Sequence, residues 1–379
     1  MNFELSQDHK VLQSAVRDFV EKEIKPIAMK IDEDHMIPDA LVTKMADMGF
    51  LGSYLPEEYG GAGLDMLSYA IVVEEVSKAC GSSGVLISAH TSLCSGPIYT
   101  FGTEEQKKKW LPALNSGEKI GCFLLTEPDA GSDAGGTATT YTRDGDDFVI
   151  NGSKTFITNG GYLGTGVLLA SYDRSLKHKG ITAFIVDLSS PGVTILKNEN
   201  KMGIRGSYTT AFAFDNLRVP VENLLGKEGK GFNVAMDTLN GGRIGIASQA
   251  LGIAEGAFER ALAYSKERKQ FGQAISEFQA IQFKLADMWT SIETSKLLTY
   301  RAACLKDAKK SYTMESAMCK MHASETATFV TKEAIQIHGG YGYIVDYEVE
   351  RMYRDAKITE IYEGTNEVQR VVISKLLLS

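Results

Sequence analysis

The sequence has little or none of the residues and motifs that mark several large classes of protein. Its five cysteines include no CxxC pair, which argues against a disulfide framework and against a dithiol redox motif. Its six histidines are dispersed and form no HExxH pattern, so no metal site is predicted. No apolar run reaches the ~18 residues that a membrane span needs. The cysteines are therefore expected to be buried, reduced thiols in a protein without a membrane span.

Motifs for nucleotide binding and for nucleophilic hydrolysis are missing as well. No complete GxGxxG follows a predicted strand, and neither GxxxxGKS nor GxxxxGKT occurs, so a Rossmann or P-loop nucleotide site is unsupported. No GxSxG is present, which removes the nucleophile elbow of the α/β-hydrolases. A redox cofactor would have to be held outside the usual dinucleotide fold.

An excess of acidic residues limits the choice of partner. Lys and Arg number 40 against 48 Asp and Glu, which gives a net charge of −8. Phosphate backbones are bound by clustered cations, so nucleic acid is not expected to be the main partner. Residues 1–8 have neither the basic start and apolar run of a signal peptide nor the arginines of a transit peptide. A cytoplasmic protein is predicted.

The first third of the chain has the periodicity of helices. Apolar residues recur at helical spacing or fill an interior helix over 7–25, 38–48 and 66–78. Thr103, followed by Gln106, predicts a capping box at the start of a further helix. Together these patterns predict an N-terminal α-helical domain over residues 1–120.

From residue 121 the pattern changes to short β segments separated by turn dipeptides. The pairs Asp144-Gly145, Asn151-Gly152 and Asn159-Gly160 are each typical of a hairpin turn. No helical pattern interrupts the series. Regularly spaced short strands favour a barrel or sandwich over a βαβ sheet, and we predict a central β-barrel domain over residues 121–228.

The remaining residues, 229–379, have helical periodicity again. One apolar face runs from Ile244 to Phe258, and another runs from Ile281 to Ile292. Long helices with short loops are typical of an antiparallel bundle, so a C-terminal four-helix-bundle domain is predicted. The predicted fold class is thus α+β and multidomain, with helical, β-barrel and helical domains in that order.

One stretch near the C-terminus, residues 354–367, combines groups that chemistry could use. Glu363 follows the apolar Ile361 and Tyr362 and precedes Gly364. Burial in such surroundings would raise the pKa of the carboxyl group and make it a stronger base, and Gly364 would let the backbone approach a ligand closely. We hypothesise that Glu363 removes a carbon-bound proton. On residue type alone, the alternative is a surface glutamate at the end of a helix.

Several motifs, taken in order, resemble those of the acyl-CoA dehydrogenase family. They are Leu125 to Asp133 (LTEPDAGSD), Phe156 to Asn159 (FITN), Glu267 to Gly272 (ERKQFG), Gln336 to Gly340 (QIHGG) and Tyr362 to Thr365 (YEGT). The resemblance covers essentially the whole chain, including its α-β-α order. The segment 88–93 (SAHTSL) and the placement of Glu363 are most similar to the short-chain, butyryl-CoA branch.

The resemblance implies an FAD enzyme that converts a saturated acyl-CoA, preferably butyryl-CoA, to a trans-2-enoyl-CoA. Glu363 would take the α-hydrogen as a proton, and the β-hydrogen would pass as hydride to flavin N5. The Glu363 amide and a ribityl hydroxyl of the flavin would bind the thioester oxygen. The family's alternative base position corresponds to Gly242, which has no side chain. Electrons would pass to an electron-transferring flavoprotein, and the reaction could also run in reverse as an enoyl-CoA reductase.

The resemblance also implies the residues that bind FAD and substrate. The flavin half of FAD would contact Phe123, Leu125, Thr126, Ser132, Phe156, Thr158, Thr365 and Glu367. The pyrophosphate and adenine half would contact Arg268, Gln270, Phe271, Gln336, Gly339 and Gly340. In the family this second set comes from a neighbouring subunit, so a homotetramer is implied. The acyl-CoA would contact Ser132, Asn240, Arg243, Tyr362 and Gly364.

Alternatives to this interpretation stay open on the sequence alone. Without the resemblance, Phe156 would be assigned to the barrel core and Arg268 to a solvated helix end. A related dehydrogenase could act on glutaryl, branched or acrylyl thioesters, although the segment 88–97 offers no arginine for a dicarboxylate. A non-catalytic electron-transfer flavoprotein component could keep the same fold. A flavin oxygenase without CoA is disfavoured, because Ser132 and Arg243 would have no evident use in it.

Overall fold

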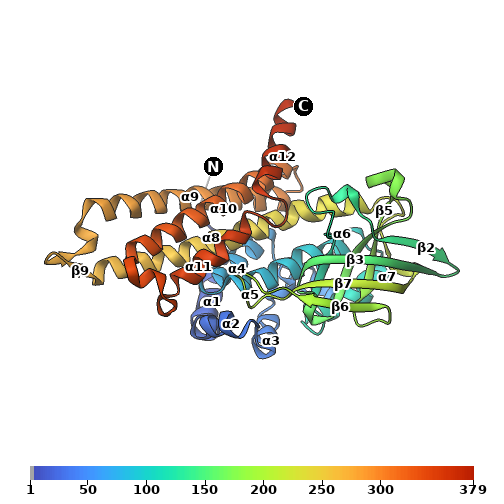
Figure 1. Cartoon of the computed structure of the whole chain (residues 1–379), viewed down its shortest axis with the longest axis horizontal. Helices are drawn as coiled ribbons and strands as arrows, with labels where there is room; N and C mark the ends of the chain where they lie inside the picture. Colours follow the sequence, from blue (N-terminus) through green and yellow to red (C-terminus); the bar gives the residue numbers. More distant parts are fainter. Residues whose placement is uncertain (1–3) are drawn as a thin grey trace.

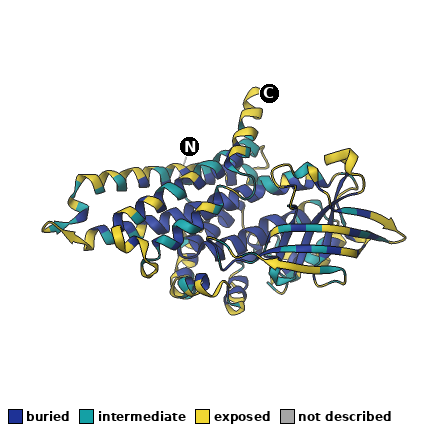
Figure 2. Cartoon of the chain, in the orientation of Figure 1, coloured by how far each residue is buried: buried dark blue, intermediate teal, exposed yellow. Residues whose placement is uncertain are grey.

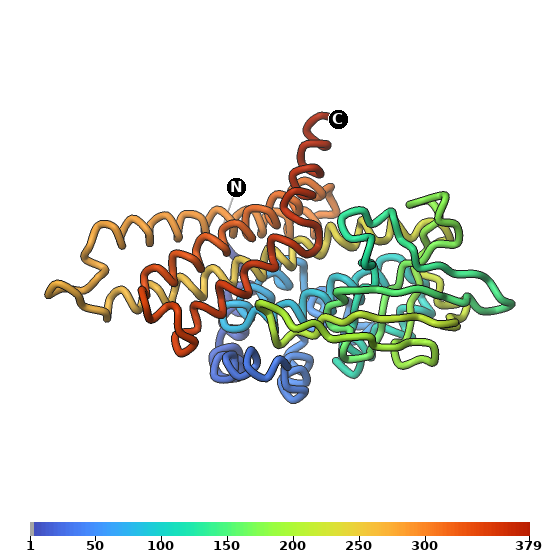
Figure 3. Tube along the Cα trace, in the orientation of Figure 1, coloured from blue at the N-terminus to red at the C-terminus, as the bar shows by residue number. Residues whose placement is uncertain are grey.

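The computed structural model describes residues 4–379, an elongated helical body with a β-sheet at one end (Figure 1). Residues 1–3, the start of the stretch considered for a signal peptide, lie outside the described part. Blue N-terminal helices and red C-terminal helices lie side by side in the body, and the green strands form the end (Figure 3). Two helical regions around a central β-domain are therefore confirmed.

The N-terminal region is helical throughout. Its elements are α1 (Gln7–Phe19), a π-helical turn (Val20–Ile24), a 3₁₀ turn (Lys25–Ile27), α2 (Ala28–Asp34), α3 (Asp39–Asp47), α4 (Met66–Ala79), α5 (Gly81–Ser88), a π-helical segment (Ala89–Ser95), α6 (Gly96–Phe101) and α7 (Glu104–Asn115). The predicted capping box is confirmed, since the Thr103 side chain accepts from Gln106 N–H while the Gln106 side chain accepts from Thr103 N–H.

The central region folds into one sheet. Its strands are β1 (Gly121–Leu124), β2 (Thr140–Asp144), β3 (Asp147–Thr158), β4 (Thr165–Ser171), β5 (Ile181–Asp187), β6 (Val193–Asn198), β7 (Thr209–Pro220) and β8 (Leu224–Leu225). Hydrogen-bonded neighbours run in the order β6-β7-β3-β2-β4-β5-β8, and β1 pairs in parallel with β4. The strand ladder therefore has two ends, β6 and β8.

Only one of the three predicted hairpin turns is a hairpin. Asp144-Gly145 joins β2 to β3, where Asp144 pairs with Asp147. Gly152 instead lies inside β3 at a register shift against β7. Glycine is needed there because the Cβ of any other residue would come within 2.7 Å of the Thr139 backbone. Asn159 has a φ of 66° and begins a 3₁₀ turn toward β4, which does not pair with β3. The Asn-Gly pair can therefore occur at a strand irregularity or at the start of a 3₁₀ turn as well as in a hairpin turn.

The C-terminal region consists of long helices. They are α8 (Gly231–Glu267), α9 (Gln279–Asp307), α10 (Thr313–His338), α11 (Val349–Thr359) and α12 (Asn366–Leu378), with the short strands β9 (Lys269–Gln270) and β10 (Gln273–Ala274) between α8 and α9. Helices α8, α9, α10 and α11 pack together, whereas α12 projects from the body (Figure 1).

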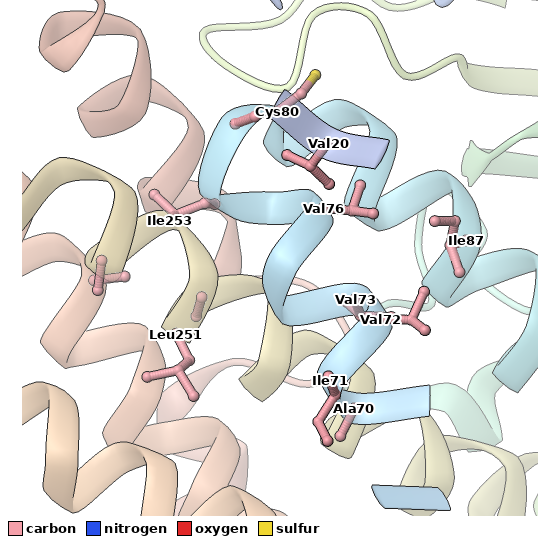
Figure 4. Close-up of a cluster of buried hydrophobic side chains, with 14 of the residues drawn as sticks. Val20, Ala70, Ile71, Val72, Val73, Val76, Cys80, Ile87, Leu251 and Ile253 are labelled. Atoms are coloured by element: carbon pink, nitrogen blue, oxygen red, sulfur yellow. The ribbon is translucent and has the colours of Figure 1, made fainter. Parts of the chain in front are cut away.

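Helix α8 lies between the two helical regions and contacts both. It packs on α4 from the N-terminal region and on α10 from its own. Gly252 and Gly256 let it approach α4 closely, since a Cβ at either position would lie within 2.2 Å of a carbonyl oxygen of Glu74 or Lys78. Buried apolar side chains of α4, among them Val72 and Val76, pack in one cluster with Leu251 and Ile253 of α8 and with Ile87 of α5 (Figure 4), and the buried residues form a continuous band through the body (Figure 2).

The cysteines and the helices bear on two expectations from composition. Cys80, Cys94, Cys122 and Cys319 are buried and Cys304 is exposed, and none of these is in a disulfide. The expectation that all five would be buried is wrong for Cys304, which lies on the outer face of α9. Of the helices within residues 4–379, none is both long and apolar enough to cross a membrane.

A buried ion pair fixes the loop that follows β1 onto β3. Lys154 Nζ donates to Glu127 Oε1 at 2.7 Å and to the Leu125 carbonyl at 3.0 Å. Glu127 also accepts the N–H groups of Ala138 and Thr139, at 2.6 and 3.1 Å. Both side chains are almost fully buried, so each charge depends on the other.

Replacing Lys154 with Met should destabilise the protein by about 3–5 kcal/mol, because Glu127 would remain buried without its cation. Thermal and denaturant unfolding measure the change. The matched control is Lys197→Met, which removes an exposed pair with Glu199 at 2.6 Å and should cost about 0–1 kcal/mol. Equal effects for the two variants would contradict the structural role of the buried pair.

Candidate active site

The loop between α11 and α12 carries Glu363 in a conformation that few residues adopt. Its φ is 53°, and the φ of Gly364 is 91°. A non-glycine residue with positive φ costs about 1–3 kcal/mol, so its surroundings must hold it there. The Glu363 N–H is donated to no acceptor among the described residues, which leaves it free for a ligand. The resemblance assigns the same N–H to the thioester oxygen.

The Glu363 carboxylate is enclosed against α8. Its Oε2 is buried and accepts no hydrogen bond from any residue in 4–379. A Cβ at Gly242 would lie 2.1 Å from Oε2 and 2.7 Å from Leu93 Cδ2. The carboxylate therefore occupies the space that a side chain at position 242 would need. A glutamate at position 242 and the Glu363 side chain in its observed position would therefore exclude each other.

Burial and two cations set the ionisation of Glu363. Loss of water raises the pKa of this carboxyl group to about 8, and the charges of Arg243 and Lys320 oppose the rise. Arg243 is buried on α8, its Nη1 donates to Asn240 Oδ1 at 2.8 Å, and its Nε has no partner among the described residues. A carboxyl group with a pKa near neutrality is suited to general base catalysis.

Tyr362 anchors the loop on the other side of Glu363. Its hydroxyl donates to Gln249 Oε1, and Gln249 Nε2 donates to the Gly81 carbonyl at 2.8 Å. Gln249 is fully buried on α8, about one turn beyond Gly245. A chain of hydrogen bonds thus links the base loop, α8 and the start of α5.

The predicted flavin contacts of the β-domain come from two strand ends that lie together. Phe123 and Leu125 are nearly buried and share an apolar cluster with Leu93, which also borders Gly242. Thr126 accepts the Thr155 N–H at 2.9 Å, which ties the end of β1 to β3. The Leu93 contact connects this region to Glu363.

Phe156 and Thr158 lie at the end of β3, and Phe156 is not a core residue. It has a φ of 57°, and 63% of its surface is exposed. The assignment of Phe156 to the barrel core is therefore wrong. An exposed phenylalanine at a strand end is suited to cover a flat ring.

The loop after Glu363 places the last two predicted flavin contacts. Thr365 caps α12, its side chain accepting the Val368 N–H at 3.4 Å. Glu367 lies exposed in the first turn of α12. Both therefore stand at the N-terminus of α12 near Glu363, and Glu367 is exposed to solvent in the single chain.

The second predicted FAD set lies at the opposite end of the molecule. Arg268, Gln270, Gly339 and Gly340 line one cavity of about 540 Å³ beside β9, whereas the strands of the β-domain are at the other end (Figure 1). Gln336 is exposed nearby on α10. One chain therefore does not bring the two halves of the predicted set together.

Phe271, in the turn between β9 and β10, belongs to this second set. Its side chain is 95% exposed. Arg268 is exposed at the end of α8, but its guanidinium lies over the Tyr341 ring, 5.6 Å from the centroid. A planar ligand could cover the exposed Phe271 ring and the Arg268 guanidinium that stacks on Tyr341.

Ser132, predicted to contact both FAD and substrate, borders a separate cavity. This cavity has a volume of about 660 Å³ and lies between the loop 132–137, the segment 174–178 and the start of α8. Its lining includes the basic residues Arg174, Lys177 and His178, and the His178 ring packs 5.5 Å from the Phe232 ring. The site is suited to an anionic group with an adjacent planar one.

Two residues that the sequence interpretation missed support the base loop. Gln249 gave no signal, because glutamine inside an apolar helix face is not itself a motif. Lys320 gave a weak one: it stands one turn after the buried Ser316 and Ala317 of α10, on a face where a lysine is unusual. Neither role could be assigned without knowing which loop lies opposite.

Comparison with known proteins agrees with this architecture. Family models for the acyl-CoA dehydrogenase N-terminal, middle and C-terminal domains match residues 6–118, 122–217 and 229–378. A Clostridium acetobutylicum protein, "Acyl-CoA dehydrogenase, short-chain specific", is 55% identical over 374 residues, covering 99% of each chain. The structure of butyryl-CoA dehydrogenase from Megasphaera elsdenii is 48% identical, with a TM-score of 0.98 and complete coverage of both chains.

A third similar chain comes from a structure described as the electron transferring flavoprotein of Acidaminococcus fermentans. It is 51% identical, has a TM-score of 0.98 and is matched over the full length of both chains. The protein belongs to the acyl-CoA dehydrogenase family. It is an oxidoreductase that acts on the CH–CH group of acyl-CoA thioesters, and members of this family are FAD flavoproteins.

Glu363→Gln should stabilise the protein in a pH-dependent way. The folded-state pKa of about 8 lies above the reference value of 4.5, so the unfolded chain ionises first as pH rises. The wild type should lose up to about 1.4 kcal/mol per pH unit relative to the variant between these two values, and nothing further above pH 8. Melting temperatures of both proteins across this window measure the difference.

Glu367→Gln is the control for that measurement, because Glu367 is exposed four residues further on in the first turn of α12, and its pKa is lowered by hydrogen bonds from its own backbone N–H and from the Thr365 side chain. Its stability difference from wild type should stay constant over the same pH window. A constant difference for Glu363→Gln as well would show that the Glu363 carboxyl group titrates normally.

Proposed function

We propose that the protein dehydrogenates short-chain acyl-CoA thioesters, with butyryl-CoA preferred, to trans-2-enoyl-CoA. The observation that carries the proposal is the enclosed Glu363 carboxylate, whose Oε2 has no hydrogen-bond partner in residues 4–379 and is held against Gly242. A carboxylate oxygen without a hydrogen-bond partner is able to accept a proton from a bound ligand. The names of similar proteins that act on short-chain acyl-CoA and butyryl-CoA support this substrate class.

The residues of the loop divide the proposed work between them. Glu363 takes the α-hydrogen as a proton, the electrons of that C–H bond form the new Cα=Cβ bond, and the β-hydrogen leaves with its own electron pair. The free Glu363 N–H donates to the thioester oxygen, where negative charge develops. FAD, when bound, supplies the acceptor for the departing hydride. Arg243 places positive charge near Glu363 without forming a hydrogen bond to its Oε2.

The polar end of the thioester fits the cavity at Ser132. CoA carries phosphate groups and an adenine ring, and Arg174, Lys177 and His178 supply positive charge or donors there. The Phe232 and His178 rings offer a planar surface beside them. We assign this cavity to the CoA nucleotide, which leaves the acyl chain on the Glu363 side of α8.

Binding of FAD would require a second copy of the chain. The exposed Phe156 and Phe271 fit a flat, partly apolar cofactor, yet Phe271 lies in the turn between β9 and β10, away from the β-domain that carries Phe156 (Figure 1). The outer face of α9 also exposes Phe283, Trp289 and Leu297, an apolar surface of the kind that subunits cover. A homotetramer, in which one copy completes the site of another, accounts for both observations.

An electron-transferring flavoprotein is the proposed electron acceptor. A chain of the same fold occurs in a structure described by that partner's name, which supports the assignment. The direction of flux, whether oxidation or enoyl-CoA reduction, depends on that partner's potential. A cytoplasmic location remains a prediction from the sequence.

Glutaryl-CoA is the alternative substrate with a structural test. A second carboxylate at the end of the acyl chain would need a cation. The buried hydroxyl groups of Tyr69 and Ser88, near Glu363, lie 3.2 Å apart, and both would be 2.3 Å from a Cβ at Gly245 of α8. Neutral hydroxyl groups in a narrow space favour a short, uncharged acyl chain over a dicarboxylate.

Butyryl-CoA should bleach the oxidised flavin band of the FAD-loaded protein under anaerobic conditions, and Glu363→Gln should slow this by about 10²–10⁴-fold, because the amide cannot accept the proton. Stopped-flow absorbance measures the rate. Glu118→Gln, which changes an exposed glutamate of the loop before β1, is the control and should bleach at the wild-type rate. Failure of wild type to bleach with any short acyl-CoA would exclude the dehydrogenase function.

Gly242→Ala should slow the same reaction by about 100-fold, because its methyl group would collide with Glu363 Oε2 and displace the base by an ångström or more. The control is the neighbouring Gly241→Ala. A methyl group at that position would come within 3 Å only of the far end of the Lys306 side chain, 2.8 Å away, and not of Glu363, so it should be tolerated. Similar rates for both variants would show that Glu363 does not depend on the space at position 242.

A further inference from the structure

Lys320 is a fully buried lysine in the middle of α10, and it has no part in the proposed chemistry. A buried ammonium needs acceptors to replace the water it has lost. Lys320 Nζ has two, the Gly364 carbonyl at 2.8 Å and Asn366 Oδ1 at 3.0 Å. Gly364 belongs to the loop that carries Glu363 and Asn366 is the first residue of α12 directly after it, whereas Lys320 belongs to a helix of the bundle.

The contact falls on the part of the loop whose backbone is least favourable. Glu363 has a φ of 53°, which a non-glycine residue keeps only when its surroundings hold it, and Gly364 follows with a φ of 91° that glycine adopts readily. Lys320 and Gln369 Nε2 both donate to this carbonyl at 2.8 Å. Ser324, one turn along α10 from Lys320, donates to Asn366 Oδ1 at 3.1 Å. The loop is therefore fastened to α10 immediately after Glu363.

The ammonium also acts on the Glu363 carboxylate through its charge. Groups of every packed element face that carboxylate: Arg243 from α8, Lys320 from α10, Tyr69 from α4 and Tyr362 from the loop itself. Only Arg243 and Lys320 are cationic, and both favour ionised Glu363. Burial lowers the pKa of Lys320 to about 8, and Glu363 opposes that shift. The carboxylate and the ammonium thus stabilise each other's charge.

We propose that Lys320 is a positioning residue for the base: its ammonium holds the Gly364 carbonyl, and with it the backbone of Glu363, in the orientation that directs the carboxylate to the substrate. A neutral donor could hold the carbonyl, but a lysine also keeps the base ionised. The inference rests on the proposed function, because it assigns Lys320 to the same proton transfer.

Lys320→Met removes the ammonium while retaining most of the apolar stem. Flavin reduction by saturating butyryl-CoA should slow by about 10–100-fold, with the dissociation constant of the thioester changed by less than about threefold, because positioning of the base is lost rather than binding. The titration of Glu363 should move to higher pH. Infrared difference spectra of the carboxyl group, assigned by their loss in Glu363→Gln, measure that shift independently of activity.

Lys332→Met is the matched control, because Lys332 is an exposed lysine of the same helix that pairs with Glu333 at 3.3 Å. Its rate, substrate affinity and Glu363 titration should equal those of wild type. If Lys320 served stability alone, Lys320→Met would lower the melting temperature but leave the rate per bound flavin and the titration unchanged. That outcome would overturn the inference.

A second variant tests the charge effect if Lys320→Met does not fold. Asn366→Asp has nearly the same shape and keeps both donors to position 366, so the Gly364 contact should persist. Its added negative charge should raise the pKa of Glu363, visible in the infrared titration. An unchanged titration in Asn366→Asp would overturn the electrostatic role of Lys320. Failure of wild type itself to bleach would instead count against the proposed function and leave the titration results standing.

Discussion

The structure depends on keeping one carboxylate oxygen, Glu363 Oε2, away from water without a hydrogen bond of its own. Glu363 gains basicity from this enclosure, and the same enclosure opposes its ionisation. Two buried cations, Arg243 and Lys320, reduce that cost without contacting the carboxylate oxygen that faces Gly242. The balance leaves a group that can be ionised near neutral pH and is still unpaired, which is the state that proton abstraction requires.

Helix α8 and the loop of residues 360–365 together enclose Glu363 Oε2. α8 contributes Gly242 for space, Arg243 for charge and Gln249 to hold Tyr362. Its glycines at 252 and 256 bring α4 close, so the N-terminal helices close the site from the other side. The loop that carries Glu363 is consequently supported by side chains of α8, α10 and α12, and the unfavourable backbone conformation of Glu363 persists.

The elongated body explains why the predicted cofactor residues separate into two groups. The β9–β10 turn, which carries Phe271, forms one end of the molecule and lies away from the β-domain that carries Phe156 (Figure 1), so one chain does not bring the two rings to the same ligand. Their exposure is costly for an isolated chain and is useful if another copy covers it. Catalytic competence and assembly would then be linked, since the same contacts would bury the apolar rings and complete the cofactor site.

Local pattern in the sequence determined the α-β-α order, the capping box at Thr103 and the choice of Glu363, because helical periodicity, caps and family motifs are properties of neighbouring residues. It misplaced the turn at Gly152 and gave Phe156 a core alternative, since a bulge or an exposed ring depends on what lies across the sheet. Only the tertiary structure paired Lys320 with the Gly364 carbonyl, 44 residues away in the chain, because long-range contacts arise from helix packing that no local pattern records.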